Sequence, residues 1–396
     1  MPSPKFYSIA LLIETSTGMG RSLLQGISHF SNLNGPWYFE ISPDDFSETL
    51  SRIHRGDCHG VIARLTNKSD ARQILKAGIP TVAIGAVNES ISKDLSNAKI
   101  GEASSNPTEV ARLAVNHLSS RNIKHFAFVG CEERGWSQRR ETAFVQVLAE
   151  RGNEPSVYRQ PRSRAQRVWE RERHILADWI AKQPLPLGIL ACDDERGRQV
   201  IEACSLAQRR VPQDIAVIGV DNDELFCDMA DPPLSSVALN GFGAGFKAAE
   251  LLNGMMTNRI RKPRRIVIEA TGIVCRRSTD TTGTSDANLA AALRLIRDAE
   301  GETLSVERVV EVSTLSRSEL ERQFRDNLGR SIHEEIQIAR LNLAKKLLLD
   351  TQLPIPQCAT RAGFNTLSYF NQFFAKHAGK TPKRFRGDLI VSAKRA

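Results

Sequence analysis

Short apolar runs alternate with amphipathic helical stretches along the first two thirds of the chain. The runs that predict strands cover residues 7–13, 37–41, 60–64 and 80–85, and a helical pattern fills residues 21–30. Strands of this length, separated by amphipathic helices, are typical of a parallel sheet with helices on both faces. We therefore expect a doubly wound α/β lobe in this part of the chain.

A second series of the same kind follows a predicted helix at residues 109–119. Its members are the predicted strands 125–130, 187–192 and 215–220 and the predicted helices 141–151, 169–182 and 196–208. Two series imply two lobes, and a helix at 241–255 with a strand at 265–269 can return the chain to the first lobe. The expected bounds are about 5–105 and 239–270 for lobe 1, and about 106–238 for lobe 2. A ligand is expected in the cleft between them, held by loops at the carboxyl ends of the strands.

The last part of the chain has helical periodicity only. A polar stretch without periodicity at residues 278–285 predicts a linker, so we expect an α/β core at 1–280 and an all-α domain at 281–396. The helices predicted in this domain cover 287–299, 304–311, 316–327, 331–349, 353–359 and 366–377. Pairs of short helices at about 304–327 and 353–377 predict two helix-turn-helix units.

The predicted helix between the two units has a length that suits DNA. Residues 331–349 form a helix of about 19 residues, which spans roughly 28 Å at 1.5 Å per residue. Successive major grooves on one face of DNA lie about 34 Å apart, so the two units could enter neighbouring grooves.

The second unit has the residues that a tight helix-turn-helix needs. Ala359 is small enough for two helices to cross closely, Gly363 tolerates a positive φ in the turn, and Phe364 can fill the angle between the helices. The first unit has Val310 and Thr314 where the small residue and the turn glycine are expected. The geometry of its turn is therefore less well defined by the sequence.

Charge and composition agree with a protein that binds a polyanion. The 396 residues are 41% hydrophobic and carry a formal charge of +9. From residue 284 onward there are 18 Lys and Arg against 13 Asp and Glu, so this part carries more than half of the surplus. A basic surplus there is what contact with phosphates requires, although many basic proteins bind no nucleic acid.

The seven cysteines indicate reduced thiols and no metal site. They are scattered singly, with no C-x-x-C pair and no histidine at zinc spacing. The apolar run near the N-terminus is only as long as one strand, and no segment approaches the roughly 18 apolar residues of a spanning helix. We therefore expect a cytoplasmic protein that needs no cofactor or metal.

Residues 359–386 carry a family resemblance. The letters A-T-R-A-G-F, Y-F-N-Q-F-F and G-K-T-P-K-R-F-R, in this order, resemble the signature of the AraC-type transcription regulators. The first unit matches that family at Ser316, Arg317, Ser318 and Phe324 and departs from it at its turn.

The α/β part carries a second resemblance. The stretches V-I-G-V-D-N-D-E-L at 217–225 and P-P-L-S-S-V-A at 232–238 resemble the LacI-type ligand core, which is similar to periplasmic sugar-binding proteins. A LacI-like core followed by AraC-like helix-turn-helix units is the arrangement of the xylose-operon regulator family. Further matches are L-L-I-E-T-S at 11–16, G-P-W at 35–37, H-F-A-F-V-G at 125–130 and R-R-S-T-D at 276–280. The resemblance implies a sugar-responsive regulator that binds operator DNA, more often an activator working with RNA polymerase, and a homodimer.

The candidate ligand residues come from loops that follow predicted strands. The resemblance places Asp221 at a sugar-contacting acidic position, Arg140 at the arginine of an R-x-x-G-[FW] motif whose glycine is Ala143 here, and Asp193 at a position that is often Asn. Asn222 is expected to orient Asp221, and Asp194 to cap the next helix. Trp136, Ser16 and Asn88 are candidates by their place in these loops alone. A turn-capping Asp221, a surface Arg140 and an ordinary packing role for Trp136 are the structural alternatives.

The candidate DNA residues lie on the polar sides of the two second helices. Those expected at base edges are Arg317, with Ser316, Ser318 and Arg322 beside it, and Asn365, Thr366, Ser368, Tyr369 and Gln372. Those expected at phosphates are Lys376, Lys380, Lys383 and Arg384. The structural alternative for each is a solvated helix face.

Two other functions were weighed against regulation. A nucleotide- or sugar-dependent enzyme on a doubly wound core is suggested by Gly18-Met19-Gly20 after the first strand, but Leu23 stands at the third glycine of G-x-G-x-x-G and no Walker sequence occurs. A transport-type binding protein leaves the last hundred residues unexplained. We therefore expect a regulator and not an enzyme.

Overall fold

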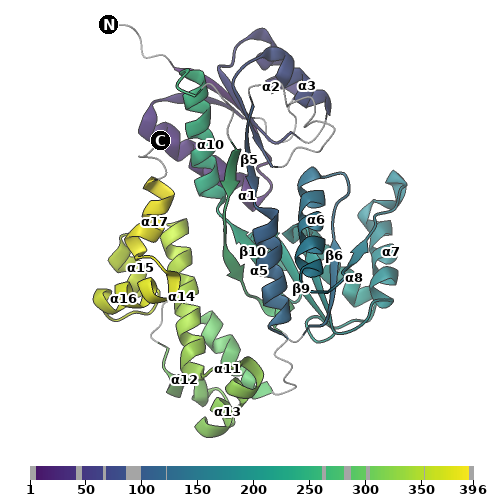
Figure 1. The fold of residues 1–396 in the computed structure, drawn as a ribbon, viewed down its shortest axis with the longest axis vertical. Helices are drawn as coiled ribbons and strands as arrows, with labels where there is room; N and C mark the ends of the chain where they lie inside the picture. Colours follow the sequence, from purple (N-terminus) through teal and green to yellow (C-terminus); the bar gives the residue numbers. More distant parts are fainter. Residues whose placement is uncertain are drawn as a thin grey trace. The chain divides into compact units, whose positions relative to one another are not determined.

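A computed structural model describes residues 6–41, 47–65, 68–85, 100–121, 123–260, 265–280, 287–299, 304–351 and 353–391. Contacts within the chain divide it into two compact units, Met1–Asp280 and Thr281–Ala396 (Figure 1). In the described part of the chain, no helix has the length and apolar character needed to cross a membrane.

The first lobe of Met1–Asp280 is built on a parallel six-stranded sheet. Its strands, in the order β11-β5-β4-β3-β1-β2, are β1 (Tyr7–Leu12), β2 (Trp37–Ile41), β3 (Gly60–Ala63), β4 (Thr81–Ile84), β5 (Ile100–Ser105) and β11 (Arg265–Ile268). Helices α1 (Gly18–Asn34), α2 (Ser47–Arg55), α3 (Lys68–Ala77) and α10 (Gly241–Met256) accompany this sheet. Because β11 pairs in parallel with β5, the chain returns to this sheet after α10.

Helices α1 and α10 cross very closely in this lobe, as their neighbouring ribbons show (Figure 1). Gly26 and Gly245 lie at the crossing, where an added Cβ would stand only 2.0 Å from the carbonyl oxygens of Phe242 and Leu23, respectively. The helices can therefore approach only because both positions lack a side chain.

The second lobe has its own six-stranded sheet. Its strands, in the order β12-β10-β9-β8-β6-β7, are β6 (His125–Val129), β7 (Ser156–Tyr158), β8 (Leu187–Ala191), β9 (Ile215–Asp221), β10 (Ser235–Leu239) and β12 (Ala270–Val274). The accompanying helices are α5 (Pro107–Ser119), α6 (Gly135–Ala149), α7 (Trp169–Ala181), α8 (Asp194–Leu206) and α9 (Glu224–Met229), with single 3₁₀ turns η1 (Arg164–Gln166) and η2 (Arg277–Thr279). All pairs are parallel except β10 with β12, which is antiparallel.

Among the described residues, the chain passes between the two sheets at three places. These crossings follow Ser105, Leu239 and Ile268, which end β5, β10 and β11. The last crossing leads into β12, which the sequence did not predict because its five residues are all half-buried and lack a strong apolar run. Two lobes joined by three such connecting segments have the geometry of a hinge.

One predicted boundary in this lobe was wrong in a way that matters for the site. Helix α6 begins at Gly135, six residues before the predicted start at Glu141. Trp136, Arg139 and Arg140 therefore project from the first turns of a helix and not from a loop. A helix fixes the direction of these side chains more tightly than a loop does.

Thr281–Ala396 is helical where the structure describes it. Its helices are α11 (Ala287–Asp298), α12 (Val306–Glu311), α13 (Arg317–Leu328), α14 (Ile332–Asp350), α15 (Ile355–Arg361), α16 (Leu367–Ala378) and α17 (Pro382–Val391). The prediction of an α/β core followed by a helical domain with two helix-turn-helix units is confirmed.

Helix α14 serves two small hydrophobic cores. Its N-terminal half places Ile332 and Ile336 in a cluster with α11, α12 and α13, and its C-terminal half places Ala344 and Leu348 in a cluster with α15 and α16. A capping box starts the helix, because Ser331 and Glu334 each accept a hydrogen bond from the other's backbone N–H. One long helix thus carries both helix-turn-helix units.

Candidate functional site

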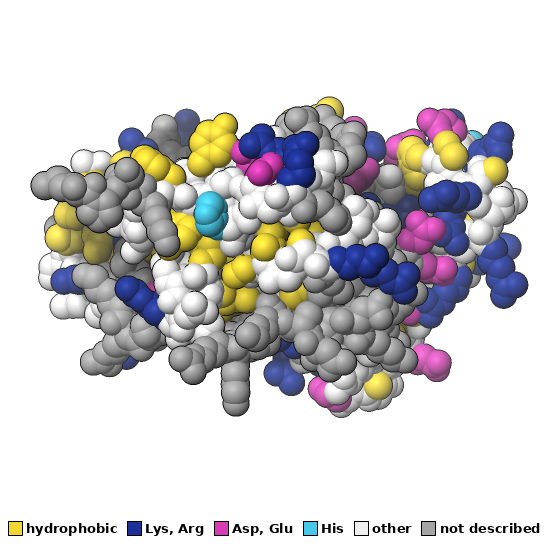
Figure 2. All heavy atoms as spheres, turned by 90° about the horizontal axis from the view of Figure 1, so that it is seen from above, with side chains coloured by type: hydrophobic (Ala, Val, Ile, Leu, Met, Phe, Trp, Pro, Cys, Tyr) yellow, Lys and Arg dark blue, Asp and Glu magenta, His cyan; other side chains and the backbone are white. Residues whose placement is uncertain are grey.

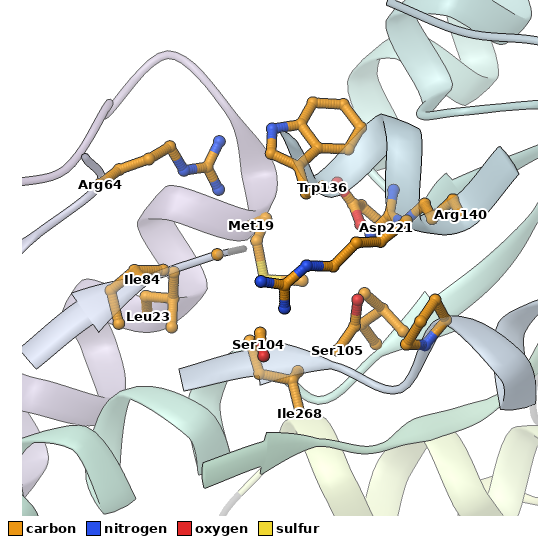
Figure 3. A pocket seen from close by; sticks show the side chains of 14 residues that line it. Met19, Leu23, Arg64, Ile84, Ser104, Ser105, Trp136, Arg140, Asp221 and Ile268 are labelled. Atoms are coloured by element: carbon orange, nitrogen blue, oxygen red, sulfur yellow. Dashed lines mark hydrogen bonds and ion pairs between the residues drawn. The ribbon is translucent and has the colours of Figure 1, made fainter. Parts of the chain in front are cut away.

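A pocket lies where the three crossings meet. Its lining consists of Met19, Leu23, Arg64, Ile84, Gly85, Ser104, Ser105, Pro107, Trp136, Arg139, Arg140, Asp221, Leu239 and Ile268. Figure 3 shows Trp136, Arg140 and Asp221 on the side of the second lobe, with Arg64, Leu23 and Ile84 on the side of the first. Charged, hydroxyl, aromatic and aliphatic side chains therefore meet in one place.

Arg140 and Asp221 form the central polar contact of the pocket. Arg140 Nη2 donates to Asp221 Oδ1 at 3.0 Å, and Arg140 Nη1 donates to the carbonyl oxygen of Cys192. The Arg140 side chain is only 6% exposed, while that of Asp221 is 22% exposed. Arg140 Nε is buried and has no hydrogen-bond partner within the described part of the chain. Among the described residues, one N–H of this buried guanidinium is therefore left without a hydrogen-bond partner.

The backbone at the end of β9 is strained. Asp221 has a φ of 102° and Asn222 a φ of 54°, although neither is glycine. Left-handed backbone of this kind costs roughly 1–3 kcal/mol per residue and persists where surrounding structure imposes it. The strain turns the chain sharply after β9, so that Asp221 faces the pocket.

Trp136 lies between the arginine and the opposite lobe. Its ring is 5.0 Å from Arg140 Cζ, a cation–π distance, and its Cδ1 lies 4.0 Å from the Cβ position of Gly85 in the first lobe. A half-buried indole in this place offers a flat apolar face to a small molecule. Such a face suits the C–H surface of a ring compound.

Two further arginines of the pocket are held by carboxylates. Arg139 Nη1 lies 3.3 Å from Glu102 Oε1 on β5, and Arg64 Nη1 lies 2.9 Å from Glu14 Oε2. With Arg140 and Asp221, each guanidinium that lines the pocket has a carboxylate beside it. The lining is therefore rich in donors and acceptors yet balanced in charge, which suits an uncharged ligand with many hydroxyls.

A second contact joins the lobes near the pocket. Asp223 Oδ2 accepts a hydrogen bond of 2.6 Å from the backbone N–H of Gly18 at the start of α1, and Arg21 Nη2 lies 3.8 Å from Asp223 Oδ1. A carboxylate at a helix N-terminus is stabilised by the orphan N–H groups there. Because Asp223 follows Asp221 by two residues, this contact links the strained end of β9 to the first lobe.

Asp193 caps a helix and does not face the pocket. Its side chain accepts from the backbone N–H of Arg196 at 2.8 Å and so caps α8, and it does not line the pocket. The expectation that Asp194 would cap this helix is wrong, because Asp194 instead accepts from the backbone N–H of Asp223 and from the Ser236 hydroxyl. Burial raises the pKa of Asp193 to about 6 and that of Asp194 well above its usual range.

The other predicted ligand residues do not meet in the pocket. Asn222 accepts a hydrogen bond of 2.9 Å from Arg276 Nη1, so its side chain holds the turn after β9. Ser16 is exposed, and its carbonyl oxygen accepts from Arg21 Nη1 at 2.9 Å. Asn88 lies outside the described residues. Of the seven predicted ligand residues, the structure brings together Asp221, Arg140 and Trp136.

The sequence interpretation missed the contribution of the first lobe. Met19, Arg64, Ser104 and Ser105 line the pocket but were not among the candidates. A usable signal existed for Arg64, which directly follows the buried run of β3 at its carboxyl end. The two serines end β5, a strand that the sequence did not predict.

The second helix-turn-helix unit exposes every one of its DNA candidates. Asn365, Thr366, Ser368, Tyr369 and Gln372 are exposed at the start of α16, and Lys376, Lys380, Lys383 and Arg384 are exposed after them. Thr366 also caps α16 by accepting from the backbone N–H of Tyr369 at 3.3 Å. Leu367 is 41% exposed, whereas Phe370, Phe373 and Phe374 of the same helix are buried.

The first helix-turn-helix unit presents a surface that is already ion-paired. Its candidates Ser316, Arg317, Ser318 and Arg322 are exposed, and Ser316 caps α13. Arg317 Nη1 lies 3.1 Å from Glu307 Oε1, and Arg322 Nη2 lies 2.5 Å from Glu319 Oε1. Both arginines must leave these carboxylates, or share them, before they can contact DNA.

Some basic residues of the α/β core near α7 are ion-paired. Figure 2 shows Lys and Arg mixed with Asp and Glu at the end of the molecule where α7 lies in Figure 1. Ion pairs there include Arg159 with Glu141 at 2.7 Å and Arg167 with Glu133 at 2.6 Å.

Comparison with known proteins assigns both parts of the chain. Residues 115–279 match the periplasmic binding protein-like domain, and residues 309–388 match the helix-turn-helix domain. The xylose operon regulatory protein of Escherichia coli (strain K12) is 29% identical over 96% of this chain and 97% of its own length. The protein of that name from Haemophilus influenzae is 27% identical over 96% of this chain and 98% of its own.

A solved structure agrees with this assignment. The structure of the xylose-binding transcription activator xylR covers 96% of this chain and 98% of its own, with a TM-score of 0.61 and 27% identity. The predicted resemblance to the xylose-operon regulators is therefore confirmed. This chain is a helix-turn-helix transcription regulator with a periplasmic-binding-protein-like core, similar over nearly its whole length to the xylose operon regulatory proteins.

Proposed function

We propose that the protein is a transcription activator controlled by a small neutral monosaccharide, xylose or a close relative, bound in the interlobe pocket. The observation that carries this proposal is the Arg140–Asp221 pair in the pocket, where a buried guanidinium holds a partly exposed carboxylate beside the Trp136 ring. A sugar hydroxyl can accept from the arginine and donate to the aspartate at the same time. The names of the relatives, xylose operon regulators and a xylose-binding activator, favour the same class of ligand.

Ligand binding would act on the contacts between the lobes. Arg139 with Glu102 and Asp223 with Gly18 already join the two lobes around the pocket. A sugar that touches residues from both sides adds interactions only when the lobes are closed, so it shifts the population toward the closed form. Its effect on regulation is limited to its difference in affinity for the two forms.

The output is operator recognition by α13 and α16. We propose that Arg317, Asn365 and their neighbours contact base edges while the basic residues around α17 hold phosphates. Helix α14, with 19 residues, is roughly 28 Å long and suits two units that enter neighbouring major grooves. Recruitment of RNA polymerase, action as a homodimer and a place in the cytoplasm complete the proposal and follow from the type of regulator.

The ligand half is tested by thermal shift of the full-length protein across pentoses and hexoses. D-Xylose or a related sugar should raise the melting temperature, and the rise should disappear in Asp221→Ala and Arg140→Ala. Matched controls are Asp214→Ala and Arg210→Ala, which break an Asp–Arg pair of 2.8 Å on the surface of the same lobe. These controls should keep the full shift. If no sugar stabilises the wild-type protein, the ligand half is wrong.

The DNA half is tested with operator DNA against a scrambled sequence. Asn365→Ala and Arg317→Ala should each weaken specific binding by about 1–3 kcal/mol while changing nonspecific binding much less. Arg308→Ala is the control, because Arg308 is an exposed arginine of the same domain that pairs with Glu311 and precedes the recognition helix. An unchanged ratio of specific to nonspecific affinity would contradict the assignment of these residues.

A further inference from the structure

Two cysteines lie side by side behind the ligand pocket. Cys131 follows β6 and Cys192 follows β8, and the two strands are paired in parallel with Val129 opposite Ala191. The Sγ atoms of Cys131 and Cys192 are 3.8 Å apart.

The two thiols differ in access. Cys131 is half-buried and is the more accessible of the two residues, whereas Cys192 is fully buried. The Cys192 S–H donates to Cys131 Sγ. This hydrogen bond lowers the pKa of the Cys131 thiol, while burial raises the pKa of the Cys192 thiol well above its usual range. A half-buried thiol with a lowered pKa beside a fully buried thiol is the arrangement of an attacking and a resolving cysteine.

We propose that Cys131 and Cys192 form a reversible intramolecular disulfide when the protein meets a hydroperoxide. Neither the ligand pocket nor the DNA surface uses these thiols, so the pair is a separate modification site. The proposal rests on the 3.8 Å separation, the unequal access of the two sulfurs and their place at the ends of paired strands.

The chemistry balances with one hydroperoxide for each disulfide. The Cys131 thiolate attacks the outer peroxide oxygen, the O–O bond breaks, and the leaving alkoxide takes a proton to become an alcohol, or water when the oxidant is hydrogen peroxide. Cys131 is then a sulfenic acid. Cys192 sulfur attacks the Cys131 sulfur, the S–O bond breaks, and the hydroxide leaves as water with the Cys192 proton. A dithiol such as dithiothreitol reverses the bond by thiol–disulfide exchange.

The disulfide would alter the ligand pocket through Arg140. The carbonyl oxygen of Cys192 accepts from Arg140 Nη1, and the same guanidinium donates to Asp221. Closing the gap between the sulfurs from 3.8 Å to the roughly 2.05 Å of an S–S bond displaces the side chain of Cys192, the residue whose carbonyl oxygen holds Arg140. Arg140 then loses part of its support. Where the reduced protein binds D-xylose as proposed above, oxidation should weaken that binding about tenfold, the loss expected when a charged hydrogen bond is disturbed.

Peptide mapping tests the disulfide directly. Full-length protein is treated with hydrogen peroxide, blocked with an alkylating agent, digested with trypsin without reductant and examined by mass spectrometry. Cleavage after Lys and Arg places Cys131 in peptide 125–134 and Cys192 in peptide 183–196. A linked 125–134/183–196 species that disappears with dithiothreitol is the expected result. If both peptides carry the alkylating agent after a treatment that oxidises Cys275, the proposal is overturned.

Three variants separate the roles of the thiols. Cys192→Ala should stop at the Cys131 sulfenic acid, which dimedone traps, and Cys131→Ser should leave Cys192 unmodified because the more accessible sulfur is gone. Cys275→Ser is the matched control, since Cys275 is an exposed thiol elsewhere, and it should keep the linked species. Trapping of a sulfenic acid at Cys192 instead would contradict the assigned order of attack.

A second arm follows D-xylose affinity by calorimetry before and after oxidation. Wild-type and Cys275→Ser proteins should lose affinity and regain it with dithiothreitol, and Cys131→Ser should be insensitive. Unchanged affinity in protein that contains the linked peptides would refute the coupling to Arg140. A reduced protein that binds no sugar would refute the proposed ligand, while peptide mapping would still decide the disulfide.

Discussion

The second helix-turn-helix unit turns at Gly363 with a φ of 80°, whereas the first turns at Thr314 and has no residue of positive φ within its described turn. In the first unit, the Asn288 side-chain oxygen accepts from the Thr314 backbone N–H at 2.8 Å and from its hydroxyl at 3.0 Å. Asn288 belongs to α11, outside the helix-turn-helix itself. The first turn is thus held by a neighbouring helix, and the second by its own backbone conformation.

The hydrophobic cores of the two units differ in the same way as the turns, because the first depends more on neighbouring helices. Phe364 fills the angle between α15 and α16 and lies 5.0 Å from the ring of Phe370 and 5.3 Å from that of Phe373. Phe324 of α13 is fully buried but packs among aliphatic residues such as Leu293 and Leu320. The second unit is stabilised by aromatic contacts within itself, while the first draws part of its core from α11 and α14.

Charge separates the units further. Residues 304–330 contain five arginines and five carboxylates, whereas residues 353–386 contain six lysines and arginines and no Asp or Glu. The first unit is therefore neutral and ion-paired, and the second is a basic surface. The two units thus share a helix-turn-helix architecture but differ in surface charge. We infer that the second unit supplies most of the electrostatic affinity for DNA.

The largest expected contrast is between Phe364→Ala and Phe324→Ala. Each change removes a buried ring and should destabilise its own unit by about 3–5 kcal/mol. The loss at Phe364 should be larger, since aromatic pairs add roughly 0.5–1.5 kcal/mol beyond the buried area. Hydrogen exchange along α14 measures both, because its first half reports on the first core and its second half on the second.

The two halves of α14 also serve as mutual controls. Phe364→Ala should speed exchange in the half that contains Ala344 and Leu348, and Phe324→Ala in the half that contains Ile332 and Ile336. Equal acceleration along the whole helix by either variant would show that the units do not have independent cores.

Smaller effects are expected at the turns. Gly363→Ala forces a side chain into left-handed backbone and should cost about 1–2 kcal/mol, while Thr314→Ala loses one side-chain hydrogen bond to Asn288 and should cost about 0.5–1.5 kcal/mol. Thr314→Gly is the informative control. Because this turn does not need a positive φ, glycine there should destabilise the protein, as measured by urea unfolding, and a stabilising Thr314→Gly would contradict the comparison.

The DNA contrast is expected in the salt dependence of binding. Lys383→Ala and Arg384→Ala should each reduce the slope of log affinity against log salt by about one, the value for one phosphate contact. Arg322→Ala should change the slope much less, because Arg322 is already paired with Glu319 at 2.5 Å. Fluorescence anisotropy over a salt series measures all three slopes. Equal changes at Arg322 and Lys383 would remove the electrostatic distinction between the units.

Patterns local in sequence were predicted well, and contacts distant in sequence were not. The buried strands β8 and β9 appear as apolar runs, and the second helix-turn-helix follows from the small, glycine and aromatic positions around Gly363. Strand β7 has only three residues and β12 is half-buried throughout, so neither carries enough apolar pattern to be recognised.

In the candidate site, too, contacts between residues distant in sequence were not predicted. Arg140, Asp221 and Trp136 were proposed from the second lobe. The contacts to the first lobe beside them, Arg139 with Glu102 and Asp223 with Gly18, depend on how two sheets close on each other, which no local pattern encodes. Adjacent aspartates are equally ambiguous. Sequence could not decide that Asp193 and not Asp194 caps α8, since both are good caps and only tertiary contacts to Ser236 and Asp223 select between them.

The smallest expected effect tests whether the carboxylates of the first unit lower its affinity for DNA. Glu307→Gln removes the charge that lies 3.1 Å from Arg317 and frees that arginine for DNA, so affinity should rise a few-fold and the salt slope should steepen by up to about one contact. Glu311→Gln is a control, because its partner Arg308 lies outside the recognition helix.

Lowering the pH from 8 to 5 should not reproduce the effect of Glu307→Gln on DNA affinity. Hydrogen bonds from its own backbone N–H and from Ser305, aided by Arg317, hold the pKa of Glu307 below its usual 4.5. The Glu307 side chain therefore stays a charged carboxylate between pH 5 and 8 and becomes protonated only at lower pH. Anisotropy titrations at pH 5.5 and 7.5 should give the same ratio of Glu307→Gln to wild-type affinity. A ratio that collapses toward one at pH 5.5 would mean that Glu307 is already protonated there, and that the neutral surface of the first unit is set by something other than this ion pair.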